Sequence, residues 1–377
     1  MLSRINTKQL KGLAVLLMLA HHLFTFPDRW PSGFEFNNNV IINNTLINII
    51  GNFGKICVPI FMFLGGYGLY ASCVYYENNE IKIKNVFINK VVNLYKCYWK
   101  VFLIFVPIGI LFFSNQHTFL NSNYGNSFSN TGFHKVIATF FGLENNFNYE
   151  WWFFKHYLFA LFEGFVFIEL FKKNKSVYFE IVFIILWYIL ITGLLPDLIS
   201  LGNLQSLANN FWYNSFFGIT PYSVLFFVGI LFSKYDIFKY WNDIIVNLSI
   251  IEKIVLSLVT LSLCVYVRYG ISSLDLDVLL VPFVCFSMLV LMNCISLLGK
   301  MLLFIGKNST NMWLTHSFYC YYFYPFVRMV YYSKNAVISY LTLVILSLLT
   351  SILIDLLWKY IFKLYHKVHI FLLNKGY

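Results

Sequence analysis

Long apolar segments alternate with short polar segments along the whole chain. An apolar run of roughly 20 residues forms a helix that can cross a lipid bilayer, and a helix satisfies its own backbone hydrogen bonds there. The pattern therefore predicts an all-α, polytopic integral membrane protein with about ten transmembrane helices. We expect these helices over residues 10–26, 50–75, 97–114, 152–171, 177–195, 215–233, 249–268, 277–298, 309–331 and 335–362.

Several of these segments are short or carry polar residues within an apolar run. Polar residues inside a membrane face the interior of the helix bundle or a water-filled cavity. We therefore expect the helices to surround a central cavity. No linker or repeat interrupts the pattern, so residues 1–377 are expected to form a single transmembrane domain with no appended soluble domain.

Composition and charge agree with this class and indicate a topology. Hydrophobic residues make up 59% of the chain and charged residues only 11%. The net charge of +11 is spread over many short segments, which argues against nucleic-acid binding. With both termini in the cytoplasm, all but seven of the 27 basic residues fall on the cytoplasmic side, as the positive-inside rule requires. The seven exceptions are Arg29, Lys55, Lys135, Lys155, Arg268, Arg328 and Lys334.

Two connections between the predicted helices differ from the rest. Residues 76–97 are basic and aromatic, and they are expected to lie on the cytoplasmic surface, against anionic lipid head groups, before the chain turns into the third span. Residues 115–150 form the longest outer loop and are rich in Asn, Ser, Gly and Phe.

The first predicted helix places a cation and an imidazole on one face. Lys11 and His22 are eleven residues apart, so at about 100° per residue they align within about 20° and lie about 16 Å apart along the helix. His21 points in another direction. Lys11 would sit near the membrane surface and His22 near the middle of the bilayer, where an ionisable group is costly and usually functional.

Each of these two residues has a functional and a structural interpretation. His22 suits a general base, a nucleophile that carries an acyl group, or a polar contact between helices. Lys11 suits binding of phosphate groups, or it is one of the cations that flank a membrane span.

Further polar residues near the spans are candidates for binding a substrate. Ser309 and His316 are seven residues apart and share a helix face; they would line the cavity, or Ser309 would cap a helix and His316 would pack against a neighbour. Trp152 would stack on a sugar or lie at the membrane interface. A carboxylate could orient the ring of His22, as in a catalytic triad. The candidates for that carboxylate are Glu163, Glu169 and Asp355.

No metal site is expected. The seven cysteines lie mostly in apolar segments without ligand spacing, and they are expected to be small buried residues. The histidines at 21–22, 366 and 369 have no matching carboxylates or cysteines at recognisable spacing.

Four segments, in this order, resemble the acyltransferase-3 family of membrane-bound O-acyltransferases. They are Leu10-Lys11-Gly12-Leu13-Ala14 through His22, Val58-Pro59-Ile60-Phe61-Met62-Phe63-Leu64-Gly65-Gly66-Tyr67-Gly68-Leu69, Phe87 through Trp99, and Ile305-Gly306-Lys307-Asn308-Ser309 through His316. The basic residue and histidine of the family fall on Lys11 and His22, where arginine is commoner at the first place. Gly65 replaces a serine of the family pattern, and Lys90 keeps half of an expected basic pair.

The resemblance implies an O-acyltransferase in the cell (plasma) membrane. Such an enzyme would move an acyl group, with acetyl as the expected one, from cytoplasmic acetyl-CoA to a hydroxyl of a surface glycan or its lipid-linked precursor. Lys11 and Lys90 would then bind the phosphates of the donor, and His22 would be catalytic.

Two other functions also account for polar residues inside a membrane. One is a transporter or flippase for a glycan or its precursor, although the chain shows no pair of matching halves. The other is a non-catalytic membrane subunit of a glycan-synthesis complex.

Overall fold

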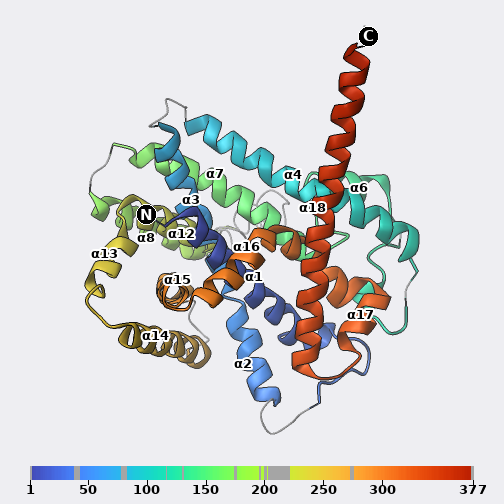
Figure 1. The fold of residues 1–377 in the computed structure, drawn as a ribbon, viewed down its shortest axis with the longest axis horizontal. Helices are drawn as coiled ribbons and strands as arrows, with labels where there is room; N and C mark the ends of the chain where they lie inside the picture. Colours follow the sequence, from blue (N-terminus) through green and yellow to red (C-terminus); the bar gives the residue numbers. More distant parts are fainter. Residues whose placement is uncertain are drawn as a thin grey trace. The chain divides into compact units, whose positions relative to one another are not determined.

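A computed structural model describes residues 2–37, 43–77, 83–115, 117–129, 131–173, 176–194, 197–198, 202, 221–271 and 276–374. Within these ranges the regular structure is entirely helical (Figure 1). The α-helices are α1 (Arg4–Phe24), α2 (Asn44–Gly54), α3 (Cys57–Glu77), α4 (Ile83–Phe112), α5 (Ser122–Gly125), α6 (Phe133–Phe140), α7 (Trp152–Phe171), α8 (Val177–Ile189), α12 (Pro221–Lys234), α13 (Ile237–Ile244), α14 (Ile250–Gly270), α15 (Asp277–Cys294), α16 (Ser296–Ser317), α17 (Tyr324–Tyr331) and α18 (Ala336–Asn374). Short 3-10 helices lie at η1 (Pro27–Arg29) and η2 (Tyr149–Trp151), and π-helical turns at η3 (Leu190–Leu194) and η4 (Phe318–Tyr322).

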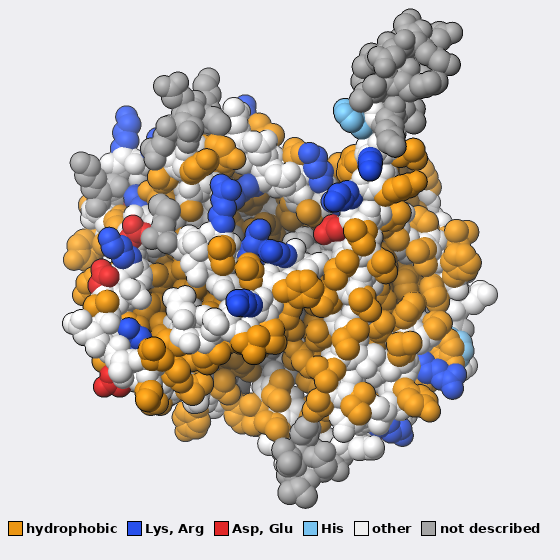
Figure 2. Space-filling model, in the orientation of Figure 1, with side chains coloured by type: hydrophobic (Ala, Val, Ile, Leu, Met, Phe, Trp, Pro, Cys, Tyr) orange, Lys and Arg blue, Asp and Glu red, His pale blue; other side chains and the backbone are white. Residues whose placement is uncertain are grey.

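Five segments are long and apolar enough to cross a membrane within the described ranges. They are Asn44–Glu77, Ile83–Phe112, Ile250–Gly270, Asp277–Cys294 and Ala336–His366, and Val177–Ile189 and Tyr222–Lys234 are shorter apolar helices. Hydrophobic side chains cover much of the face in Figure 2. On α14, for example, Val255, Leu258 and Val259 are each more than half exposed. Side chains of this kind suit contact with lipid, so the fold indicates a multi-pass membrane protein.

Helices occupy all ten predicted ranges at least in part, while residues 195 and 215–220 lie outside the described residues. One predicted turn is wrong. Helix α4 runs without a break from Ile83 to Phe112, so no turn separates the basic stretch from the apolar one. The physical reason is that no glycine or proline interrupts the chain before Pro107.

The boundary between the eighth and ninth predicted spans is also wrong. Helix α15 ends at Cys294 and α16 begins at Ser296, so the expected loop over residues 299–308 is helical. Ser309 therefore lies inside α16 and does not cap it. Helix formers fill this stretch, and its glycines serve close packing instead of ending the helix.

That close packing joins α16 to α1. A Cβ atom added to Gly306 would lie 1.7 Å from the carbonyl oxygen of Lys8, and one added to Gly12 would lie 2.1 Å from that of Leu302. The two backbones therefore touch at these glycines, as small residues allow between membrane helices.

The described chain divides into two compact units. Unit 1 comprises Met1–His21, Ile49–Asn93 and Trp151–Gly306, and unit 2 comprises His22–Asn48, Leu94–Glu150 and Lys307–Tyr377. Each unit is assembled from three separate stretches of sequence. The candidate site described next lies within unit 2. The expectation of one domain over residues 1–377 stays a prediction.

Candidate active site

His22 lies in the last turn of α1, where the helix leaves its final carbonyl groups without helical partners. The Tyr321 hydroxyl donates a hydrogen bond to the carbonyl oxygen of His22, and Trp30 Nε1 donates to that of Leu23 at 2.9 Å. Two residues separate the end of α1 from Pro27, which begins the short 3-10 helix η1. These side chains fix the position of His22 at the end of the helix.

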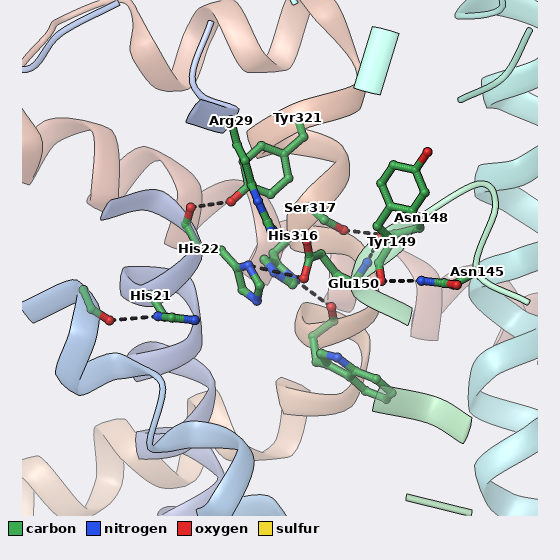
Figure 3. Close-up of polar contacts among 12 residues, drawn as sticks. His21, His22, Arg29, Asn145, Asn148, Tyr149, Glu150, His316, Ser317 and Tyr321 are labelled. Atoms are coloured by element: carbon green, nitrogen blue, oxygen red, sulfur yellow. Dashed lines mark hydrogen bonds and ion pairs between the residues drawn. The ribbon is translucent and has the colours of Figure 1, made fainter. Parts of the chain in front are cut away.

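Glu150 lies beside the ring of His22 (Figure 3). Its Oε2 atom is 3.5 Å from His22 Nδ1, and its Oε1 atom accepts a hydrogen bond from Arg29 Nη1 at 2.9 Å. The exposed fractions of His22 and Glu150 are only 12% and 5%. A buried carboxylate needs such partners, so Arg29, Glu150 and His22 form one connected charge network.

This arrangement assigns the tautomer of His22. Because Nδ1 faces the carboxylate, the proton of the neutral ring belongs on Nδ1, and Nε2 keeps the lone pair. The same relation of carboxylate to imidazole orients the base in catalytic triads.

The segment that carries Glu150 is held by its own side chains. Asn148 Oδ1 accepts from the backbone N–H of Glu150 at 3.0 Å, and Asn148 Nδ2 donates to Ser317 Oγ at 2.7 Å. The Tyr149 N–H donates to the Tyr322 hydroxyl at 2.8 Å. These bonds tie the segment that precedes α7 to the end of α16 and to η4.

The π-helical turn η4 supplies two of the anchoring groups, the hydroxyls of Tyr321 and Tyr322. Its five residues, Phe318–Tyr322, are all buried. A π-turn is wider than an α-turn and is frequent at functional sites. Here it follows α16 directly and places Tyr321 against the His22 carbonyl group and Tyr322 against the Glu150 segment.

His316 lies in the last turn of α16, next to His22. The two ring centres are 4.8 Å apart, with an angle of 48° between the planes. His316 is fully buried, and its Nδ1 donates to the Trp313 carbonyl oxygen at 2.7 Å. Its Nε2 atom therefore holds a lone pair, and it has no hydrogen-bond partner among the described residues.

Burial raises the pKa of the Glu150 carboxyl group, and the Arg29 charge opposes this rise. The charge state of Glu150 therefore depends on Arg29.

The structure thus brings together two of the residues predicted from sequence, His22 and His316. Ser309 is also in unit 2, buried on α16, seven residues before His316. Its role in binding a substrate stays a prediction. His21 faces elsewhere, as predicted, since its Nδ1 atom lies 2.9 Å from the Gly51 carbonyl oxygen.

The other predicted site residues belong to unit 1. Lys11 lies on α1 and Lys90 on α4, and Lys90 is within electrostatic reach of Lys11 and of Arg4. Trp152 begins α7, where its ring contacts His156 and Tyr222 at 4.8 and 5.9 Å between centres. Their roles stay predictions.

Within unit 2 the carboxylate next to His22 is Glu150, which was not among the three candidates from the sequence. Asp355, also in unit 2, accepts a hydrogen bond from Asn311 Nδ2 at 3.1 Å. A role of Glu163 or Glu169 stays a prediction. Glu150 lies beside His22 because the segment before α7 folds back onto the end of α16, a long-range contact that spacing along the chain does not show.

One signal in the sequence does point to Arg29. Only four of the 27 basic residues are arginines, and Arg29, Arg268 and Arg328 are expected on the outer side. Arginine binds carboxylates through a planar group with several donors, which lysine does not match. Two of these three arginines pair with buried carboxylates, Arg29 with Glu150 at 2.9 Å and Arg268 with Asp277 at 2.7 Å. Arg328 bonds the Tyr324 hydroxyl group.

Comparison with known proteins agrees with the resemblance. No protein of curated function and no solved structure matches this chain. The sequence profile of the acyltransferase domain of the acyltransferase-3 family matches residues 6–356, which is nearly the whole chain. Because this match covers nearly the whole chain, the protein is a member of the acyltransferase-3 family of membrane acyltransferases.

Proposed function

We propose that this membrane acyltransferase moves an acetyl group from cytoplasmic acetyl-CoA to a hydroxyl of a surface glycan or of its lipid-linked precursor. Family membership shows acyl transfer. The observation that supports oxygen as the acceptor atom is the pairing of His22 with Glu150. A hydroxyl group needs a base to become a nucleophile, and this pair supplies one.

His22 would act as the general base through Nε2. It takes the proton of the acceptor hydroxyl while that oxygen attacks the carbonyl carbon of the thioester. His22 then returns the proton to the departing sulfur, so that the products are an O-acetyl ester and the free thiol of CoA. Glu150 stabilises the imidazolium that exists between the two transfers, and Arg29 keeps Glu150 charged.

Covalent catalysis by His22 is the alternative step. In that case Nε2 attacks the thioester itself, the thiol of CoA leaves, and the acceptor hydroxyl then takes the acetyl group from the imidazole. Acid quenching of the protein with labelled acetyl-CoA but without acceptor distinguishes the two routes, because only the covalent route leaves label on His22.

Lys11 and Lys90 would bind the phosphates of the donor. Lys90 is within electrostatic reach of Lys11 and Arg4, all in unit 1. A local gathering of positive charge attracts phosphate groups, which supports a phosphate ligand here. Arg29 is not counted among these phosphate-binding cations, because it pairs with Glu150 beside His22.

Ser309, His316 and Trp152 would bind the acceptor. The proposed topology has ten spans around a central cavity in the plasma membrane, with both termini in the cytoplasm. The donor would then enter from the cytoplasm and the acceptor from the outer side.

The test is acetyl transfer by the purified protein in liposomes. Labelled acetyl-CoA is mixed with glycan extracted from the producing cells, and ester-linked label on the glycan is measured. His22→Ala is the inactive variant and His21→Ala the matched control. Movement of unmodified glycan across the liposome without ester formation would instead indicate a transporter.

A further inference from the structure

The end of α6 is attached to α4 by side chains that donate hydrogen bonds to its carbonyl groups. The pairs are Tyr98 Oη with the Thr139 carbonyl oxygen at 2.6 Å, Trp99 Nε1 with that of Phe140 at 2.9 Å, and Tyr95 Oη with that of Phe141 at 3.0 Å. All of these residues belong to unit 2. The last turn of α6 therefore lies beside residues 95–99 of α4.

This contact is far from the outer end of α4. Phe112 ends that helix, and Tyr98 lies fourteen residues before it, which is about 21 Å along the axis. The segment before α6 contacts α4 nearer its outer end, because a Cβ atom added to Gly109 would lie 2.2 Å from the ring of Phe128. Thr139 thus lies about 16 Å further along α4 than Phe128 does.

Helix α18 gives a second measure of this depth within unit 2. Trp358 Nε1 donates a hydrogen bond to the carbonyl oxygen of Lys100, the residue after Trp99, at 3.3 Å. From Ala336 to Trp358 the helix rises about 33 Å, and the hydrocarbon core of a bilayer is about 30 Å thick. In the proposed topology α18 runs from the outer side to the cytoplasm. The last turn of α6 then lies close to the cytoplasmic interface.

The carbonyl groups at the end of α6 are paired as a membrane requires, since no water is present there to bond them. The Leu143 N–H donates to the Ala138 carbonyl oxygen at 2.9 Å, and the Gly142 N–H donates to that of Thr139 at 2.9 Å. Gly142 has a φ of +69°, which suits the turn that closes a helix in this way. With the bonds from α4, every carbonyl group of residues 138–141 has a donor.

One face of α6 is apolar and exposed. Phe133, Ile137 and Phe141 follow one another at intervals of four residues, so they share a face, and their exposed fractions are 81%, 40% and 48%. His134 and Lys135, in the first turn, are also exposed. A helix with an apolar face and a basic residue suits the boundary between lipid chains and head groups.

We propose that the segment carrying α6 is re-entrant, and that α6 lies on the lipid surface of the cytoplasmic leaflet. The segment enters the membrane from the outer side, reaches the cytoplasmic interface at α6 and returns to Glu150. This inference rests on the topology in the proposed function. It also removes Lys135 from the basic residues that the positive-inside rule leaves on the outer side. Lipid contact by α6 would then help to hold the segment that carries Glu150.

The experiment compares two cysteines only eight residues apart, Asn126→Cys and His134→Cys, both at exposed positions. Each is placed in a cysteine-free background and treated with an impermeant thiol reagent. Asn126→Cys should react on intact cells, and His134→Cys should react at least about tenfold less until the cells are opened. Equal labelling of the two on intact cells overturns the inference, as does no labelling of His134→Cys in opened cells.

Asn242→Cys separates this inference from the topology on which it rests. Labelling of Asn242→Cys on intact cells overturns the topology, and the inference with it. Where Asn242→Cys and Asn126→Cys label as the topology requires, His134→Cys alone decides whether α6 is re-entrant.

A second measurement decides the result if His134→Cys fails to insert. The photoreactive residue p-benzoylphenylalanine replaces Phe133, and the purified protein is irradiated in vesicles of phosphatidylglycerol and phosphatidylethanolamine. We expect an adduct with phospholipid. The same residue in place of Tyr124, which is only 6% exposed, is the control and should react within the chain. An adduct of the Phe133 probe with a second copy of the chain, or none with lipid, overturns the inference.

Discussion

At the level of single residues, His22 combines burial, a capped helix end and a carboxylate partner. Each of these features holds the ring in one orientation, and the carboxylate also stabilises its protonated form. His21, its neighbour in sequence, instead contacts the Gly51 carbonyl group in unit 1. Two adjacent histidines therefore have different environments, which makes them a matched pair for mutation.

His22→Ala should reduce acyl transfer by at least about a thousandfold, because the reaction loses its base. His21→Ala should lower it by less than about tenfold, since it removes a hydrogen bond to a carbonyl group and leaves the base in place. Transfer to glycan is measured at equal amounts of membrane-inserted protein. Equal losses at the two positions would contradict the role of His22.

Arg29→Gln should move the acidic limb of the pH–activity profile to higher pH. Burial already raises the pKa of Glu150, and the Arg29 charge opposes the rise, so its removal raises that pKa further. Glu150 is useful to His22 only as a carboxylate, and it would then be lost at a higher pH than in wild type. The pH dependence of kcat is the measurement. Arg328→Gln is the control, because the Arg328 side chain bonds Tyr324 instead of a carboxylate.

Lys11→Ala should weaken acetyl-CoA binding by about tenfold, and Lys11→Arg should largely retain it, because phosphate attraction requires the positive charge. Isothermal titration of the purified protein with acetyl-CoA measures this. Unchanged affinity in Lys11→Ala would leave Lys11 as a cation that only sets topology.

At the level of elements, α1 and α16 touch through glycines. The Gly306 backbone approaches the Lys8 carbonyl oxygen so closely that an added methyl group has no room. The two helices would have to separate at this point. Close contact between α1 and α16 is thus a structural requirement of unit 1.

Gly306→Ala should destabilise the protein by about 1–3 kcal/mol, the usual cost of overpacking. Gly68→Ala is the control within a helix, because a Cβ atom there meets nothing within 4 Å. The Tm of the detergent-solubilised protein is compared for both variants. A Gly306→Ala protein as stable as Gly68→Ala would show that the helices can move apart freely.

At the level of the whole molecule, the proposed route needs a donor side and an acceptor side. Positive-inside counting puts α13 in the cytoplasm and the loop that carries α5 outside. Asn126 at the end of α5 and Asn242 on α13 are both exposed positions for a label. Asn79, in the basic stretch that is expected on the cytoplasmic surface, would be another position for a label, but it lies outside the described residues.

In a cysteine-free background, Asn126→Cys should react with an impermeant thiol reagent on intact cells, and Asn242→Cys should react only after the cells are opened. Labelling of Asn242→Cys on intact cells would overturn the ten-span topology. It would also overturn the route that carries the acetyl group from cytoplasm to surface.

The sequence by itself determined the helices and the first catalytic candidate. Backbone groups in a membrane must pair within their own segment, so each apolar run had to become a helix. The eleven-residue spacing of Lys11 and His22 then placed both on one helix face. Helix ends were predicted less well, because the glycines of α16 pack against α1 instead of ending the helix.

Only the tertiary structure decided which groups surround His22. Arg29 and Glu150 are 121 residues apart in the chain, and Glu150 ends a loop whose position depends on Asn148 and the end of α16. No local pattern encodes such a contact, because it depends on how the loop folds back. The same holds for His316, whose helix position could be predicted but whose unpaired nitrogen beside His22 appears only when the two helix ends meet.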